Sequence, residues 1–189
     1  MKSLFLAAAL AAIALPALAQ PAPRKTAPAS TPAAPSDTPD CAAMGTLAAN
    51  WNGQAYAIDG DTLAGVGLKP RIRLWGIQAP ELRDGAKAES VAGMRARAAL
   101  EDLLEQSSHK VKCRAIKFDR DCHMVAQCSL DDAQAGDIGS GLIAAGMAYG
   151  FNLHEAPSWE SRASQRYATA EAEARKQRRG LWKDWLGDR

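Results

Sequence analysis

Three residues that could act together on a phosphate group lie within one short stretch, residues 57–81. Asp61 lies in an Asp-Gly-Asp-Thr turn, Arg73 in an alternating basic and apolar run, and Glu81 directly after a proline. Two strand-like runs joined by a Gly-containing turn fold back on each other, which brings acids at both ends near the arginine between them. A carboxylate, a base and a cation in one hairpin indicate phosphate chemistry.

Five short runs of residues predict the strands that position this hairpin. Because a strand turns successive side chains to opposite faces, Arg73 shares one face with Arg71, and Ile72 lies on the other. The predicted strands cover residues 54–58, 62–67, 71–77, 110–118 and 123–130.

Three stretches rich in helix-forming residues predict helices, at residues 88–106, 136–146 and 158–179. The charged side chains of the first helix are expected on a solvated face: Arg95, Arg97, Glu101 and Asp102. Short strands with interspersed helices predict an α+β fold, a small β-barrel that carries about three packed α-helices on one side.

The N-terminal region has the layout of a targeting segment followed by a tether. Residues 1–19 combine one basic residue, an apolar run and an Ala-x-Ala ending, which predicts a secretory signal peptide. Residues 20–40 are rich in Pro, Ala, Ser and Thr and predict a disordered linker. We expect an exported protein, periplasmic or secreted, with a domain at residues 41–189 and no membrane span in the mature chain.

The net charge of the chain does not by itself indicate a binding partner. The chain has 23 basic and 21 acidic residues, a formal net charge of +2. A protein coated with basic residues for nucleic-acid binding has a much larger excess. Any phosphate binding must therefore come from a local arrangement of residues.

Four cysteines follow the predicted cleavage site, at positions 41, 113, 122 and 128. An even count in an exported chain favours disulfides, and three pairings are formally open. If Arg120 and Asp121 form the centre of the turn between the last two strands, Cys113 lies opposite Cys128. We favour that disulfide, which leaves Cys41 to pair with Cys122.

The motifs on these elements resemble the staphylococcal-nuclease-like (thermonuclease) family over residues 54–182. They are Ile-Asp-Gly-Asp-Thr at residues 58–62, Arg-Leu-Trp-Gly-Ile at 73–77 followed by Ala-Pro-Glu at 79–81, and a C-terminal run from Tyr167 to Trp182. The resemblance implies a five-stranded OB-like β-barrel. It also implies a metal-dependent enzyme that cleaves phosphodiester bonds in DNA, RNA or both, with single- or double-stranded nucleic acid as its partner.

The resemblance also implies roles for individual residues. A calcium ion is expected on Asp61, helped by Gln78 and the carbonyl of Ala79. Glu81 is expected to orient or deprotonate the attacking water, and Arg73 to neutralise charge on the phosphoryl oxygens.

Two positions depart from the family pattern. Gln78 stands where the family has an aspartate, which removes one negative charge and weakens calcium binding. His123 stands where the family has a phosphate-binding arginine, and it is expected to act at the leaving group when protonated. The expected function is an exported nuclease weakened by these changes. The alternative is an inactive nuclease-like domain that binds nucleic acid or an envelope partner, and in either case we expect a monomer.

Overall fold

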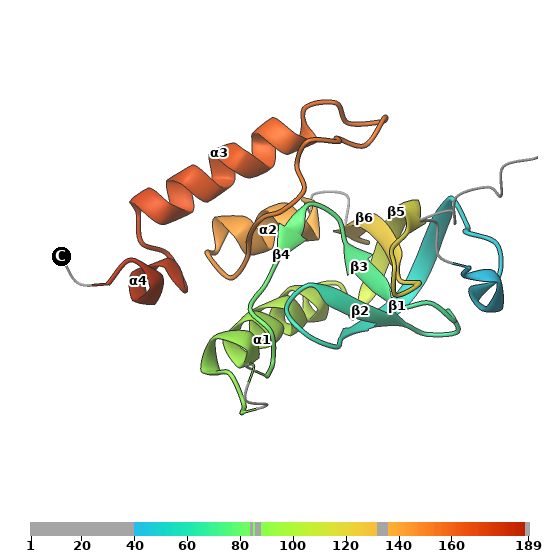
Figure 1. Cartoon of the computed structure of the whole chain (residues 1–189), viewed down its shortest axis with the longest axis horizontal. Helices are drawn as coiled ribbons and strands as arrows, with labels where there is room; N and C mark the ends of the chain where they lie inside the picture. The colour runs from blue at the N-terminus through green and yellow to red at the C-terminus, as the bar shows by residue number, and fades with distance from the viewer. Residues whose placement is uncertain (1–39, 84, 86–87, 132–135, 188–189) are drawn as a thin grey trace, which may run out of the picture. The chain divides into compact units, whose positions relative to one another are not determined.

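The predicted barrel is present in the computed structural model, which describes residues 40–83, 85, 88–131 and 136–187. Five strands close in the order β1-β2-β3-β6-β5, and all neighbours are antiparallel except β3 and β6, which are parallel (Figure 1). The signal peptide and most of the linker expected at residues 1–40 lie outside the described residues. The strands are β1 Asn50–Ala57, β2 Thr62–Gly65, β3 Ile72–Leu74, β5 Lys110–Phe118 and β6 Met124–Leu130.

The structure has three main helices, as the sequence predicts, and two of them pack directly on the barrel. Helix α1 packs against β1, α2 against β6, and α3 against α2, so that α2 lies between α3 and the barrel (Figure 1). Ser90 and Asp137 cap the first two helices by accepting main-chain N–H groups. In the described part of the chain, no helix is long and apolar enough to cross a membrane. The helices are η1 Ala42–Met44, α1 Val91–Glu105, α2 Ile138–Ala144, α3 Ala163–Lys176 and α4 Trp182–Trp185.

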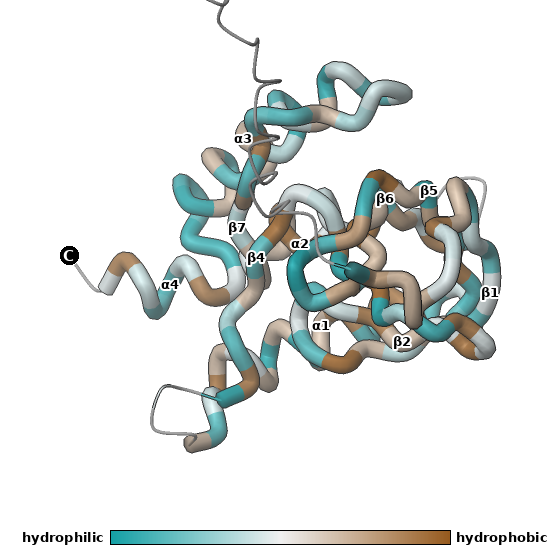
Figure 2. Tube along the Cα trace, turned by 45° about the vertical axis from the view of Figure 1, so that its right-hand side comes forward, coloured by the Kyte–Doolittle hydropathy of each residue, from teal (hydrophilic) through white to brown (hydrophobic). Residues whose placement is uncertain are grey.

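One continuous core joins the barrel to the helices. Figure 2 shows polar and apolar residues interleaved along the elements, which is the pattern of strands and helices with one buried face. Burying each large aliphatic or aromatic side chain contributes about 1.5–3 kcal/mol. Fully or almost fully buried residues come from both parts: Leu63, Ile72 and Met124 from strands, Leu100 and Leu104 from α1, and Leu142, Ile143 and Tyr167 from α2 and α3.

The third strand is shorter than the predicted run 71–77. Gly76 has a φ of +75°, a conformation that favours glycine, and it ends the extended stretch after β3. The chain then forms a separate strand, β4 (Ile77–Gln78), which pairs with β7 (Tyr149–Gly150) outside the barrel. The prediction of one continuous strand was therefore wrong, because β4 needs a partner that lies far along the sequence.

Both favoured disulfides are present. Cys113 and Cys128 are direct partners across β5 and β6, with Cα atoms 4.1 Å apart, and Cys41 is bonded to Cys122 in the turn between these strands. The turn is centred on Asp121, since Asp119 N donates to the carbonyl of His123. An extra residue, Ile116, bulges from β5 and restores the register that pairs the two cysteines.

Candidate functional site

The acidic turn between β1 and β2 holds Asp61 inside the protein. Asp59 Oδ1 accepts a hydrogen bond from the main-chain N–H of Asp61 (3.0 Å), which closes the turn locally. A Cβ atom at Gly60 would lie 2.6 Å from the Cβ atoms of both Ala79 and Ala96, so glycine lets the turn pack against α1. The residue that follows, Asp61, is only 3% exposed.

Helix α1 fixes the strand that leads into this turn. Glu101 Oε2 accepts the main-chain N–H of Ala57 (2.9 Å), and Arg97 Nε donates to the Ala57 carbonyl (3.2 Å). His109 Nε2 lies 2.9 Å from the same carboxylate. Burial opposes ionisation of Glu101, but these hydrogen bonds outweigh it and lower its pKa. Arg97 is exposed, as predicted for a solvated face, but Arg97 and the half-buried Glu101 also bond to the end of β1, which the sequence does not predict.

Every oxygen of the Asp61 carboxylate has a partner. Oδ1 lies 2.8 Å from Arg73 Nη1 and accepts a hydrogen bond from the Thr62 hydroxyl (3.2 Å), and Oδ2 accepts the main-chain N–H of Ala79 (2.7 Å). Burial raises the pKa of Asp61 to about 6, and the guanidinium of Arg73 and the Ala79 N–H limit that rise. At neutral pH the carboxylate is ionised and paired with Arg73.

Gln78 continues the chain of contacts from Arg73 to Glu81. Arg73 Nη2 donates to Gln78 Oε1 (2.7 Å), and Gln78 Nε2 donates to the Ala79 carbonyl (3.1 Å) and to Glu81 Oε1 (3.4 Å). A guanidinium only donates hydrogen bonds, so the amide oxygen must face Arg73 and the amide nitrogen must face the two oxygens. Asp61, Arg73, Gln78 and Glu81 therefore form a row in which each side chain contacts the next by an ion pair or a hydrogen bond.

Glu81 has an exposed side chain on a fixed piece of backbone. The backbone of Glu81 packs directly against Gly93 of α1, where an added Cβ would overlap the Glu81 carbonyl. The structure thus brings together five of the six predicted site residues: Asp61, Arg73, Gln78, Ala79 and Glu81.

These five residues do not fit a calcium ion as they are arranged. A calcium site needs several oxygen ligands aimed at one point. Here the oxygens of Asp61 and Gln78 point at hydrogen-bond donors, while the Ala79 carbonyl and Glu81 face the amide nitrogen of Gln78. A nitrogen that carries hydrogens repels a cation, so the substitution at position 78 places a donor where the resemblance implies an acceptor.

The sixth predicted residue, His123, lies apart from this row. Its Nδ1 is 3.1 Å from Asp119 Oδ2, and its main-chain N–H donates to Asp119 Oδ1 (2.8 Å). Together with Asp121, these side chains form a group whose ligand atoms lie within 4.8 Å of one another and could hold a metal ion. Among the described residues this is the one group of three or more acidic, His or Cys side chains close enough to do so.

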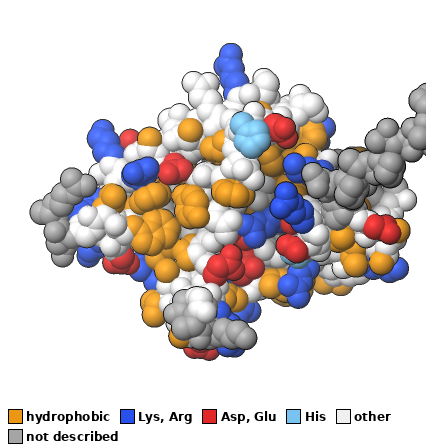
Figure 3. Space-filling view, in the orientation of Figure 1, with side chains coloured by type: hydrophobic (Ala, Val, Ile, Leu, Met, Phe, Trp, Pro, Cys, Tyr) orange, Lys and Arg blue, Asp and Glu red, His pale blue; other side chains and the backbone are white. Residues whose placement is uncertain are grey.

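A cleft of about 1130 Å³ opens beside Arg73, between the end of the barrel and the loop that precedes α3. Arg120, in the β5–β6 turn, lines its wall, whereas His123 does not. Four aromatic residues line this cleft, Trp75, Phe118, Phe151 and Trp159. The last three were not assigned to a site from the sequence, although the Phe, His and Trp residues in the loop at 151–159 could have indicated two of them. Figure 3 shows acidic and basic side chains lying next to one another near the middle of the face that it draws, so neither sign of charge covers that face.

Arg73, held by a buried acid and by Gln78 and lining an open cleft, can bind an anionic group there. No curated protein sequence matches this chain closely enough to be informative about its role. Residues 71–184, more than half of the chain, match the protein family described as "Staphylococcal nuclease homologue". With the closed five-stranded barrel, this match shows that the chain belongs to the staphylococcal nuclease family, whose members have a nuclease-like function.

Proposed function

We propose that the protein is an exported phosphodiesterase that binds nucleic acid in the cleft and cleaves its backbone. The observation that carries this proposal is the unbroken row of contacts from Asp61 through Arg73 and Gln78 to Glu81, in which Arg73 also lines the cleft. Family membership supports a nuclease-like function and nucleic acid as the partner.

In the proposed reaction, Arg73 binds a non-bridging oxygen of the phosphodiester. Its fork of N–H groups suits a phosphate, and Asp61 and Gln78 hold the fork in one orientation. Arg120, which lines the cleft from the β5–β6 turn, is the second cation that we place beside the substrate in preference to His123. The two charges neutralise negative charge as it develops on the phosphoryl group.

Glu81 acts as the base in this scheme. Its carboxylate takes a proton from water, the water oxygen forms a bond to phosphorus, and the bond from phosphorus to the leaving oxygen breaks. The leaving alkoxide takes a proton from solvent. Calcium takes no part in these steps, because the Gln78 amide nitrogen faces the oxygens that would bind it.

A second function, nucleic-acid binding without cleavage, is favoured by the same amide. The family pattern has an aspartate at this position, and here Gln78 ties Arg73 to the rest of the site without adding negative charge. Such a site retains phosphate binding while it loses the cation that would activate water.

Cleavage assays separate the two functions. The mature protein is incubated with single-stranded DNA and RNA, with calcium, with other divalent ions and with chelator, beside Glu81→Gln. Glu105→Gln, a change at an exposed residue of α1, serves as the matched control. If the wild-type protein and Glu105→Gln cleave and Glu81→Gln does not, the protein is an enzyme. If all three bind nucleic acid and none cleaves it in any condition, the second function is supported.

The two disulfides indicate an oxidising environment, and they support the proposed export. Sequencing the N-terminus of the protein recovered outside the cytoplasm tests the cleavage site after residue 19. An unprocessed N-terminus would contradict the predicted signal peptide.

A further inference from the structure

The outer face of the barrel carries a row of basic side chains on β5. Lys110, Lys112 and Arg114 are exposed, while Val111 and Cys113 between them are buried. Alternate residues of a strand lie about 6.8 Å apart, so the three charges follow one line along the strand.

The bulge in β5 extends this line to Lys117. Without an extra residue, the alternation after Arg114 would turn Ile116 outward and Lys117 toward the core. The register shift between Ala115 and Lys117 instead pairs Lys117 with Val125 and Phe118 with the buried Met124. Lys117 therefore stays on the outer face and reaches the cleft, which it lines.

Polar side chains flank the row on both neighbouring strands. The partners of the basic residues on β1 are Gln54, Asn52 and Asn50, all exposed, and those on β6 include Ser129 and Gln127. We call this surface the basic face: Lys110, Lys112, Arg114 and Lys117 of β5, with Asn50, Asn52, Gln54, Gln127 and Ser129. Its side chains offer hydrogen bonds to bases and sugars as well as charges to phosphates.

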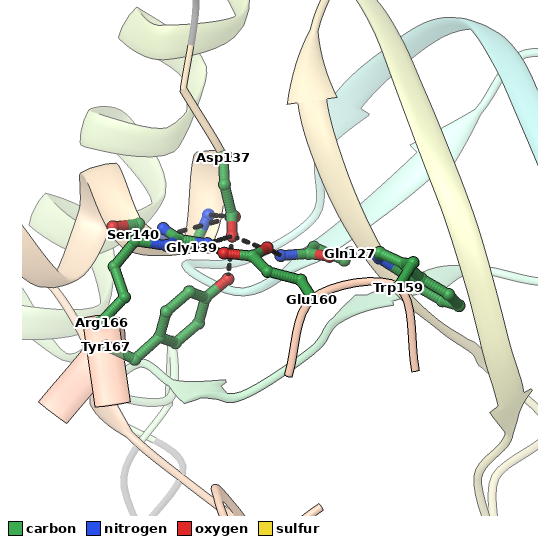
Figure 4. Close-up of polar contacts among 8 residues, drawn as sticks. All are labelled: Gln127, Asp137, Gly139, Ser140, Trp159, Glu160, Arg166 and Tyr167. Carbon is green, nitrogen blue, oxygen red and sulfur yellow. Dashed lines mark hydrogen bonds and ion pairs between the residues drawn. The ribbon is translucent and has the colours of Figure 1, made fainter. Parts of the chain in front are cut away.

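Trp159 joins the basic face to the cleft. It lines both the cleft and a hollow of about 400 Å³ on the basic face, next to Arg114 and Lys112. The Arg114 guanidinium lies 4.3 Å over the Trp159 ring, and Trp159 Nε1 donates to Gln127 Oε1 (2.7 Å). Figure 4 shows the Gln127 side chain extending between Trp159 and Asp137, which holds the indole in place.

The acidic side chains near the hollow are paired. Asp131 binds Lys112 (2.5 Å), and Arg166 binds both Asp137 (3.0 Å) and Glu160 (2.7 Å). Asp137 also accepts hydrogen bonds from Gln127 and from the Tyr167 hydroxyl, as Figure 4 shows. Burial raises the pKa of Tyr167 well above its usual range, so it remains a donor to this acid.

We infer that the basic face binds the backbone of a single-stranded nucleic acid whose neighbouring segment lies in the cleft. This inference rests on the proposed function for its choice of polyanion. A single strand can bend from the cleft past Trp159 onto β5, whereas a duplex is stiff over so short a distance. A row of cations beside an aromatic side chain is the usual way in which proteins bind single strands without sequence preference.

The length dependence of binding tests the inference. Fluorescence anisotropy compares oligothymidylates of about four and about twelve nucleotides, since binding sites on this type of barrel span roughly that range. All variants carry Glu81→Gln, so that binding is measured without cleavage. Lys110→Gln with Lys112→Gln removes two charges from the basic face. Lys176→Gln with Lys183→Gln removes two from exposed positions that line neither the cleft nor the hollow.

The basic-face variant should bind the long oligonucleotide about tenfold more weakly than the protein with Glu81→Gln alone. Its affinity for the short oligonucleotide should be unchanged. The slope of log affinity against log salt should fall by about 1.4, about 0.7 for each lost phosphate contact. Equal binding of the long oligonucleotide by both double variants overturns the inference. If the basic-face variant instead loses binding to anionic phospholipid vesicles and not to the oligonucleotide, the basic face is a membrane contact and the inference also fails.

Failure here is distinguishable from failure of the proposed function. If the protein never cleaves nucleic acid but the basic-face variant loses affinity for the long oligonucleotide alone, the inference holds and the proposed enzymatic function is wrong. If the protein cleaves nucleic acid but the basic-face variant binds the long oligonucleotide as well as the control does, the enzymatic function holds and the basic face is not a binding site.

Discussion

The carboxylate of Asp61 and the guanidinium of Arg73 form an ion pair of 2.8 Å across the β2–β3 hairpin. Arg73 is the direct partner of Thr62, the residue after Asp61, so the strand register itself sets this distance. A buried acid that depends on one cation is costly to keep ionised, and its titration should be visible in the stability of the protein.

Asp61 should lower the stability of the folded protein as pH rises. Its pKa is about 6 in the folded protein against 3.8 for an ordinary aspartate. The folded state therefore holds the proton more tightly, and the stability that it contributes is complete below about pH 3.8 and lost as pH rises through about 6. The total loss is about 3 kcal/mol.

Urea unfolding between these pH values, for the wild-type protein and Asp61→Asn, measures this effect. The difference between their unfolding free energies should change with pH in that interval and be constant above it. A difference that does not vary with pH would show that Asp61 titrates at its ordinary value.

Gln78→Asp should create a cation site beside Ala79 and Glu81. The change replaces a donor facing Ala79 and Glu81 with a carboxylate, so that its oxygens, the Ala79 carbonyl and the Glu81 carboxylate can face one cation. Millimolar calcium should then raise the melting temperature of the variant more than that of the wild type, because a ligand that binds the folded state stabilises it. Gln78→Asn is the control, and calcium should leave it unchanged. Equal shifts in all three proteins would place any calcium elsewhere.

Much of the barrel and of the hairpin that holds Asp61 and Arg73 follows from local sequence signals. Alternation predicts β5 at the bounds observed, and the antiparallel register predicts the pairing of Cys113 with Cys128. The turn is centred on Asp121 and not between Arg120 and Asp121 as predicted, and the bulge at Ile116 compensates for this shift of half a position. Bulges depend on packing across strands, which no single run of residues reveals.

The contacts around Gln78 could not be predicted for a different reason. Its amide is oriented by Arg73 on another strand and by the carbonyl of Ala79 directly after β4, and β4 exists because β7 pairs with it about 70 residues later. Likewise, Arg97 and Glu101 have charges typical of a solvated helix face, and their partners, the end of β1 and His109, lie on other elements. Polar side chains with tertiary partners are the residues for which sequence patterns are least informative.

Gly60→Ala should destabilise the protein and disturb the acidic turn. The added methyl would lie 2.6 Å from the Cβ atoms of Ala79 and Ala96, so the turn or α1 must move. Such overpacking typically costs about 1–3 kcal/mol. Gly85→Ala is the control, since a Cβ at this described residue meets nothing within 4 Å. If both variants unfold at the same denaturant concentration, the turn does not pack against α1 as observed.

Removing the Cys41–Cys122 disulfide should affect the cleft more than removing Cys113–Cys128. The first bond closes a separation of 81 residues and anchors the turn whose Asp119, Arg120 and Asp121 line the cleft. The second closes 15 residues inside a hairpin that the barrel already pairs. Loop entropy predicts losses of about 4.5 and about 3 kcal/mol. At a temperature where both double Cys→Ala variants are folded, oligonucleotide affinity should fall in Cys41→Ala with Cys122→Ala and stay close to wild type in the other. The opposite order would mean that the barrel hairpin, and not the anchored turn, shapes the binding surface.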